Sequence, residues 1–129
     1  DAESKPLSQI LQIYEETGFE SPRPDILSER LSLPLAKVEK LIEHLCHEKK
    51  LVRLDRKVIL SYHHFNYAQN EGIRIIKGKG VLNWGDFKNV IRSSRKYALA
   101  ILDYLDSIGV TMRIGSDRKL APDYVKRIL

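Results

Sequence analysis

Apolar residues recur at helical spacing along the chain. In the first half, two series follow an i, i+3, i+4, i+7 pattern, which puts each series on one face of a helix. They are Leu7, Ile10, Leu11 and Tyr14, and then Val38, Leu41, Ile42 and Leu45. A shorter apolar group between them, Ile26, Leu27 and Leu31, predicts a short second helix.

Residues typical of helix ends bracket these three helices. Pro6 suits a first helical turn, and Gly18 suits the position just past a last turn. Ser32 is expected to cap the third helix, with Pro34 in its first turn, where an N–H group has no intrahelical partner anyway. The cations at 49–50 favour the end of that helix.

A β-hairpin is predicted next, and the same order of elements then repeats. The run LVRLDRKVIL holds two β-prone stretches around Asp55 and Arg56. A helix is expected from His63 to Gly78 or Gly80, with Gly72 as a weak point in its continuity.

The remaining elements complete the second copy. VLN is a candidate short strand, and Asn83 is expected to cap a helix that contains Trp84 and Phe87. Ser93 or Ser94 can cap the next helix. VTMRI, a turn at 115–117 and RKLA then form a second hairpin, as the first copy predicts.

The two copies share one register, with an offset of 60 residues. Six pairs of apolar positions fit it: Leu27–Phe87, Leu31–Ile91, Val38–Ala98, Leu41–Ile101, Ile42–Leu102 and Leu45–Leu105. Helix–helix–helix–hairpin is the plan of a winged helix. We therefore predict a mainly α fold with small β-hairpins (α+β), built as two tandem winged-helix domains over 1–62 and 63–129.

Composition adds limits to this picture. With 43% hydrophobic and 30% charged residues, the 129-residue chain should fold. A signal peptide and a membrane-spanning run are not apparent, and one cysteine, Cys46, cannot form an internal disulfide, so a cytoplasmic setting is expected. The chain starts at Asp1 and its one methionine is Met112, so we expect a monomeric fragment of a longer protein.

The net positive charge of the chain comes from its second half. Residues 1–64 hold 10 Lys or Arg and 11 Asp or Glu, a net charge of −1. Residues 65–129 hold 12 Lys or Arg and 6 Asp or Glu, a net charge of +6. This asymmetry indicates that the second half meets a polyanion and that the first is a spacer that orients it.

The third helix of each copy shows the same contrast. Its outward positions in the first copy include three carboxylates, Glu39, Glu43 and Glu48, which would repel phosphates. In the second copy, the start of the helix gathers cations and hydroxyls where the helix dipole favours an anion. These residues are Lys88, Arg92, Ser93, Ser94, Arg95 and Lys96.

The tip of the second hairpin adds further cations, Arg113, Arg118 and Lys119. Beyond Lys96 the helix lacks the Arg, Asn or Gln side chains that read base edges in a duplex groove. A compact patch of this kind suits the end of an RNA hairpin, where unpaired bases are exposed. Tyr97 on the basic side is a candidate for stacking.

The segment SSRKYALAILDYLDSIGVTMRIGSDRKL, residues 93–120, resembles the last winged helix of the bacterial selenocysteine-specific elongation factor family. Ser-Ser-Arg-Lys-Tyr, Leu-Asp-Tyr-Leu-Asp and Thr-x-Arg-x-Gly carry the resemblance. It implies that this domain binds an mRNA hairpin, the selenocysteine insertion element, and so tethers a translation GTPase to the message.

The resemblance also implies contact residues: Arg92, Ser93, Ser94, Arg95, Lys96, Thr111, Arg113, Gly115, Asp117 and Arg118. The family has two adjacent basic residues in the wing, whereas this chain has Met112 before Arg113. In the full-length factor, GTP, Mg²⁺, selenocysteinyl-tRNA and the ribosome would be partners. The chain contains no Gly-x4-Gly-Lys-Ser/Thr phosphate loop, so we expect no cofactor and no enzymatic activity in this segment.

Other functions remain open on sequence alone. Five residues have side chains that bind zinc, namely His44, Cys46, His47, His63 and His64, but neighbours on a helix diverge, so we expect no metal. A winged helix can also be a duplex-DNA regulator, which would form dimers on a palindromic target. A module that binds other proteins is a third possibility.

Overall fold

The computed structural model describes residues 4–129, which fold as two compact units divided between His64 and Phe65. We call them the first unit and the second unit. The division falls within the first turn of a helix that runs from Tyr62 to Lys79. Across residues 4–129, no helix is both long enough and apolar enough to cross a membrane.

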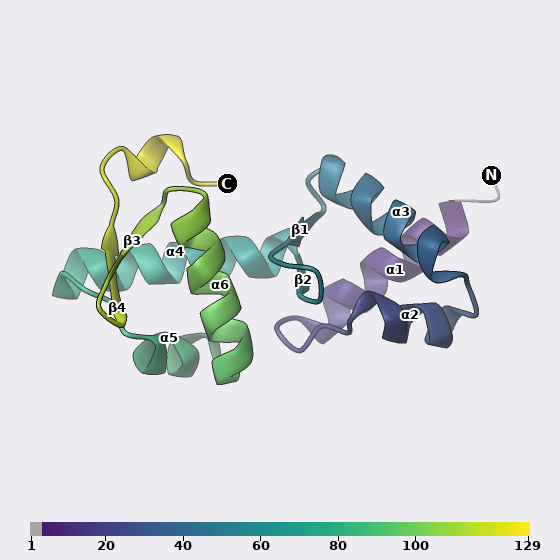
Figure 1. The fold of residues 1–129 in the computed structure, drawn as a ribbon, viewed down its shortest axis with the longest axis horizontal. Coiled ribbons are helices and arrows are strands. Elements are labelled where there is room, and N and C mark those ends of the chain that lie inside the picture. The colour runs from purple at the N-terminus through teal and green to yellow at the C-terminus, as the bar shows by residue number, and fades with distance from the viewer. Residues whose placement is uncertain (1–3) are drawn as a thin grey trace. The chain divides into compact units, whose positions relative to one another are not determined.

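The first unit consists of three helices and a β-hairpin (Figure 1). The helices are α1 (Ser4–Thr17), α2 (Pro24–Leu31) and α3 (Leu35–His47), and the strands are β1 (Leu51–Arg53) and β2 (Ile59–Ser61). The strands pair antiparallel, with Val52 opposite Leu60. Asp55 closes the turn between them by accepting hydrogen bonds from the N–H groups of Lys57 and Val58.

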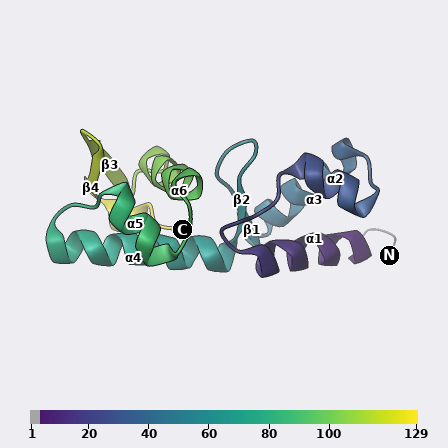
Figure 2. The same cartoon turned by 90° about the horizontal axis from the view of Figure 1, so that it is seen from below.

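The second unit has the same plan, with an added short helix at its end. It consists of α4 (Tyr62–Lys79), α5 (Trp84–Ile91), α6 (Arg95–Ser107), β3 (Thr111–Ile114), β4 (Asp117–Leu120) and a 3-10 helix (Tyr124–Lys126). Arg113 pairs with Arg118 across the hairpin, and Leu82 bridges Arg118 from the other side. Figure 2 shows α6 and the β3–β4 hairpin on the same side of α4.

The 60-residue repeat holds at the level of individual elements. The bounds of α5 and α6 are those of α2 and α3 shifted by 60 residues. The turn between the helices also repeats: Ser32 and Arg92 both adopt the left-handed conformation, each with φ of 55°. The six apolar pairs of the sequence register lie in the cores, with Leu31 partly buried and the others buried. The predicted mainly α class with small hairpins is thereby confirmed.

Each unit has its own apolar core. In the first unit, α1, α2, α3 and the hairpin contribute buried side chains, and Tyr14 joins them while its hydroxyl donates to the backbone oxygen of Pro22. In the second unit Phe65, on α4, packs its ring edge-on against Tyr104 of α6. Burial of a large apolar side chain contributes about 1.5–3 kcal/mol, so these cores hold each helix face in place.

Three details differ from the sequence expectations. Ser32 does not cap α3: it ends α2, and Pro34 occupies the N-cap of α3. VLN forms a single β-bridge at Leu82 instead of a strand. Gly72 does not interrupt α4, in which it is a buried residue packed near Leu82 and Phe87.

Candidate nucleic-acid interface

A tight turn between α5 and α6 presents the basic cluster, which we define as Lys88, Arg92, Arg95 and Lys96. Arg92 ends α5 in the left-handed conformation, and its N–H donates to the Asn89 oxygen at 3.3 Å. The Ser93 N–H donates to the Lys88 oxygen at 3.0 Å. The chain therefore reverses within three residues, and α6 begins at Arg95.

The side chains of the basic cluster point into solvent. Arg92, Arg95 and Lys96 are exposed and Lys88 is partly buried. None of the four forms an ion pair with any part of the chain that the structure describes. Their positive charge at the N-terminus of a helix opposes the helix dipole, so an anion placed there would be attracted by both.

Two aromatic rings lie beneath these cations. The Arg95 guanidinium carbon lies over the Trp84 ring, 5.1 Å from its centroid. The Lys96 Nζ lies 5.2 Å from the centroid of Tyr97. Trp84 is only partly buried, whereas Phe87 is completely buried.

The two hydroxyls of the turn differ in exposure. Ser94 is exposed at the N-cap of α6, and its side chain caps no N–H group. The Ser93 oxygen is covered by protein atoms and has no hydrogen-bond partner within residues 4–129. Of the two predicted contact residues, Ser94 is the one whose hydroxyl faces solvent.

The tip of the wing, the β3–β4 hairpin, carries the second group of predicted residues. Arg113 is exposed, and its Nε donates to the Gly115 oxygen at 2.9 Å. Gly115 has a φ of +63°, the left-handed region that glycine adopts without strain. Lys119 is exposed as well, and Asp117 is partly buried. Figure 1 shows the tip and the start of α6 both toward the α5 end of the second unit.

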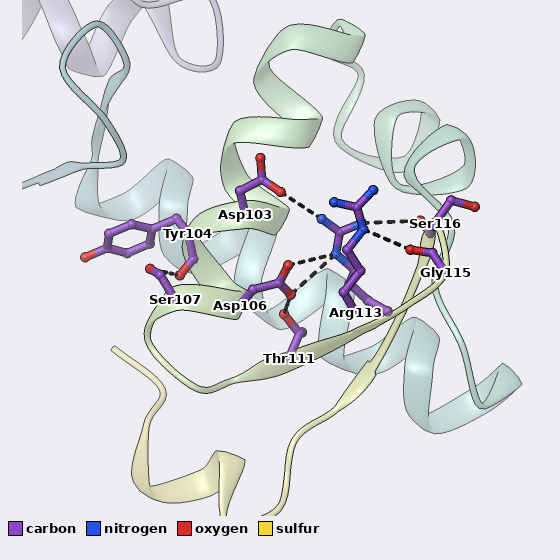
Figure 3. A network of polar contacts seen from close by, with 9 residues as sticks. Asp103, Tyr104, Asp106, Ser107, Thr111, Arg113, Gly115 and Ser116 are labelled. Atoms are coloured by element: carbon purple, nitrogen blue, oxygen red, sulfur yellow. Dashed lines mark hydrogen bonds and ion pairs between the residues drawn. The ribbon is translucent and has the colours of Figure 1, made fainter.

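Arg118 does not belong to this surface. Its side chain is only 1% exposed, and it donates to Asp106 at 3.1 Å and to Asp103 at 2.8 Å. It also donates to the Ser116 backbone oxygen at 3.3 Å. Thr111, also buried, donates to Asp106 at 2.6 Å. Figure 3 shows Asp103 and Asp106 of α6 on the side of the helix that faces the wing, with Thr111 next to Asp106.

The solvent-facing position expected for Arg118 is therefore wrong, and Thr111 is likewise buried. The reason is that two carboxylates on successive turns of α6, Asp103 and Asp106, face the wing and pair with the guanidinium. Carboxylates three residues apart on a helix share a face, and that spacing, opposite an arginine in the following hairpin, is the signal in the sequence. We call this group the wing clamp.

The first unit lacks a basic cluster at the equivalent turn. Leu33, Pro34 and Leu35 occupy the places of Ser93, Ser94 and Arg95. The arginine of its first strand, Arg53, is already paired with Glu39 at 2.6 Å. The two units thus present different surfaces on the same backbone turn, and only the second concentrates unpaired cations there.

The histidines and the cysteine do not assemble a metal site. Within residues 4–129, no group of three or more His, Cys, Asp or Glu side chains lies close enough to bind a metal ion. The Ser61 hydroxyl and the Nδ1 of His64 are hydrogen-bonded at 2.6 Å, and His63 pairs with Glu15 at 3.2 Å. Burial raises the pKa of the Cys46 thiol, which disfavours the thiolate.

Comparison with known proteins agrees with this geometry. Residues 74–120 match the family model described as elongation factor SelB, winged helix. Comparison with curated protein sequences gives no match.

Solved structures share the fold of the whole chain. The mRNA-binding domain of elongation factor SelB from E. coli, solved in complex with SECIS RNA, is 20% identical with a TM-score of 0.76; the match covers 92% of this chain and 99% of that one. A bacterial selenocysteine-specific elongation factor, EF-Sec, is 21% identical with a TM-score of 0.72. That match covers 94% of this chain but 19% of the EF-Sec chain.

The matched residues contain the basic cluster, the wing clamp and both wing strands. The family resemblance inferred from residues 93–120 is confirmed by this match. Within the second unit, residues 74–120 are thus similar to the winged helix of elongation factor SelB.

Proposed function

We propose that the second unit binds an mRNA hairpin of the selenocysteine insertion type and so tethers a selenocysteine-specific elongation factor to its message. The observation that carries this proposal is the basic cluster: four cations without ion-pair partners in the described chain, at the start of α6, within the segment that matches the SelB winged helix. The solved E. coli relative with the same fold holds SECIS RNA.

The form of the surface favours a hairpin end over a straight duplex. Beyond Lys96, the exposed side of α6 carries Asp103, and Asp106 is partly exposed. Arg118 offsets one of these two charges, so a net negative charge remains on this side of α6 and repels the phosphate rows that flank a groove. Contact is then confined to the start of α6 and the wing tip, which suits a compact loop with unpaired bases. A duplex-DNA regulator, the alternative kept open above, is not favoured for this reason.

The first unit acts in this proposal as the spacer that orients the second. Its α3 carries Glu39, Glu43 and Glu48 on exposed or partly exposed positions, so RNA would be repelled there. In the full-length factor, selenocysteinyl-tRNA, GTP and the ribosome would be handled by segments other than this one. The proposal gives the present chain a binding role and no catalytic step.

The experiment is a selection for binding from a pool of RNA stem-loops with randomised loops and bulges. We expect one family of hairpins to be enriched and to outcompete duplex DNA of equal length in a gel shift. Arg95→Ala with Lys96→Ala should weaken binding and reduce the slope of log K against log salt by about 1–2, since each cation that neutralises a phosphate contributes about one unit.

The control changes charge on the first unit instead. Glu39→Gln with Glu43→Gln is expected to leave RNA affinity unchanged, although Glu39 loses its partly exposed ion pair with Arg53. A duplex that wins the competition, or an unaltered salt slope in the Arg95 and Lys96 variant, would contradict the proposed function.

A further inference from the structure

We propose that Trp84 is a positioning residue that holds the Arg95 guanidinium in place for RNA, an inference that rests on the proposed function. Trp84 is the first residue of α5 and Arg95 is the first residue of α6. The turn at Arg92 brings these two helix starts together, so that the guanidinium lies 5.1 Å from the centroid of the ring.

The contact anchors Arg95 without using its hydrogen-bond donors. A guanidinium has five N–H donors, and a ring face attracts its charge while leaving them available. Within residues 4–129, Arg95 makes no hydrogen bond or ion pair through its side chain, and it is exposed. Arg118 is the opposite case, because Asp103, Asp106 and the Ser116 oxygen occupy its donors.

A long side chain free in solvent loses rotamer freedom when it binds, and this loss weakens affinity. The first residue of a helix is also an unfavourable place for a cation, because the dipole repels it. The ring of Trp84 offsets both effects before RNA arrives. Arg95 is thus preorganised, and Trp84 contributes to affinity through Arg95 rather than through contact of its own.

In the first unit, which has no basic cluster at this turn, other residue types occupy the two equivalent positions. Pro24 and Leu35, 60 residues earlier, are the counterparts of Trp84 and Arg95. Both line one surface hollow of about 270 Å³, so the two positions are neighbours in this unit as well. An aromatic ring and a cation thus occupy these two positions in the second unit, which carries the basic cluster, and neither is present at them in the first unit.

The test is a double-mutant cycle in RNA affinity, with the full chain and the stem-loop selected in the experiment above. Arg95→Ala should raise Kd about tenfold, and Trp84→Leu about three- to fivefold, as expected for loss of one cation–π contact near the surface. Trp84→Phe should raise Kd less than twofold. In the Arg95→Ala background, Trp84→Leu should add nothing further.

A matched control removes another cation–π contact of the second unit. Lys77 lies 5.8 Å from the ring centroid of Tyr124, and we expect Tyr124→Leu to leave Kd unchanged. Thermal unfolding followed by circular dichroism establishes that each variant is folded at the assay temperature. Trp84 is the only tryptophan, so its emission in the wild-type chain should also change when RNA engages Arg95.

The outcomes separate the inference from the function on which it rests. If Trp84→Leu lowers RNA affinity by the same factor in the wild-type and in the Arg95→Ala background, Trp84 contacts RNA itself and the positioning role is overturned. Normal affinity of Trp84→Leu, or RNA binding with unchanged Trp84 emission, would also overturn it while the proposed function stands. If no stem-loop is enriched, both fail.

Discussion

Replacement of Arg118 by alanine is expected to release the wing from α6 and to destabilise the second unit by about 3 kcal/mol. The Arg118 side chain is 1% exposed and donates to Asp103 on one turn of α6 and to Asp106 on the next. The same side chain donates to Ser116 in the turn of the wing. One guanidinium therefore connects the helix to both the strand and the tip of the hairpin.

The magnitude follows from the exposure of each partner. Removal of one member of a buried ion pair costs about 3–5 kcal/mol, because the other charge is left without a partner. Here the Asp103 side chain is 67% exposed and that of Asp106 is 24% exposed, so water solvates part of the remaining charge. We therefore take the lower end of the range. A unit of about 65 residues is expected to have about 6 kcal/mol of stability, so half of it would be lost.

Urea unfolding followed by Trp84 fluorescence measures this loss, because the only tryptophan lies in the second unit. With a slope of about 1 kcal/mol per molar urea, the midpoint should fall by about 3 M. Arg118→Lys keeps the positive charge but not the planar guanidinium, so it should lower the free energy of unfolding by about half as much as Arg118→Ala does. Asp103→Asn should cost less than about 1 kcal/mol, because that carboxylate is largely solvated.

Arg113→Ala is the matched control, since Arg113 pairs with Arg118 across the hairpin but is exposed. Its stability should stay within about 0.5 kcal/mol of wild type, as for surface substitutions in general. If Arg118→Ala destabilises the unit no more than Arg113→Ala does, the wing is held by its backbone pairing alone. The wing clamp would then have no role in positioning the tip.

Three substitutions and one measurement of thiol reactivity test local features. Asn83→Ala should lower the free energy of unfolding in urea by about 1 kcal/mol, because the Asn83 side chain caps α5 by accepting from the Asp86 N–H. Ser94→Ala should leave it nearly unchanged, because the Ser94 side chain makes no cap hydrogen bond. Gly18→Ala should lower the thermal midpoint of the first unit, because φ is +59° and the new Cβ would lie 3.0 Å from His64; an unchanged midpoint would exclude strain there. Cys46 should react with a thiol reagent at pH 8 more slowly than free cysteine, because burial raises its pKa and leaves less thiolate; an equal rate would contradict this.

The fold could be predicted because the core pattern occurs twice in one register. Val38, Leu41, Ile42 and Leu45 define the buried face of α3, and the residues 60 positions later define that of α6. Helix ends were less certain where two residues could serve the same role. Ser32 has a side chain suited to an N-cap, but the tertiary turn places it past the end of α2.

The candidate site was predicted only in part, because charge in a sequence does not reveal pairing. The sequence alone does not distinguish Arg95 from Arg118, because both are arginines in a basic segment. In the structure, Arg95 is exposed over an aromatic ring, whereas Arg118 is buried and paired with two carboxylates. The difference depends on which helix face meets the wing, and that is set by packing in three dimensions.

The comparison of the two units also indicates how a binding surface arises on this fold. The turn before the third helix has the same left-handed residue and the same backbone hydrogen bonds in both, from residue 33 to Ser28 and from residue 93 to Lys88. The backbone alone therefore cannot make one unit an RNA binder, since its dipole and geometry are shared. The two units differ in the side chains on the turn and in the partner of the arginine in the first strand of the wing. Glu39 pairs with Arg53 in the first unit, whereas Arg113 in the second unit is exposed and donates to the Gly115 backbone oxygen. In the wing clamp Arg118 offsets one of the two carboxylate charges of α6, while Arg113 at the wing tip forms no ion pair within residues 4–129.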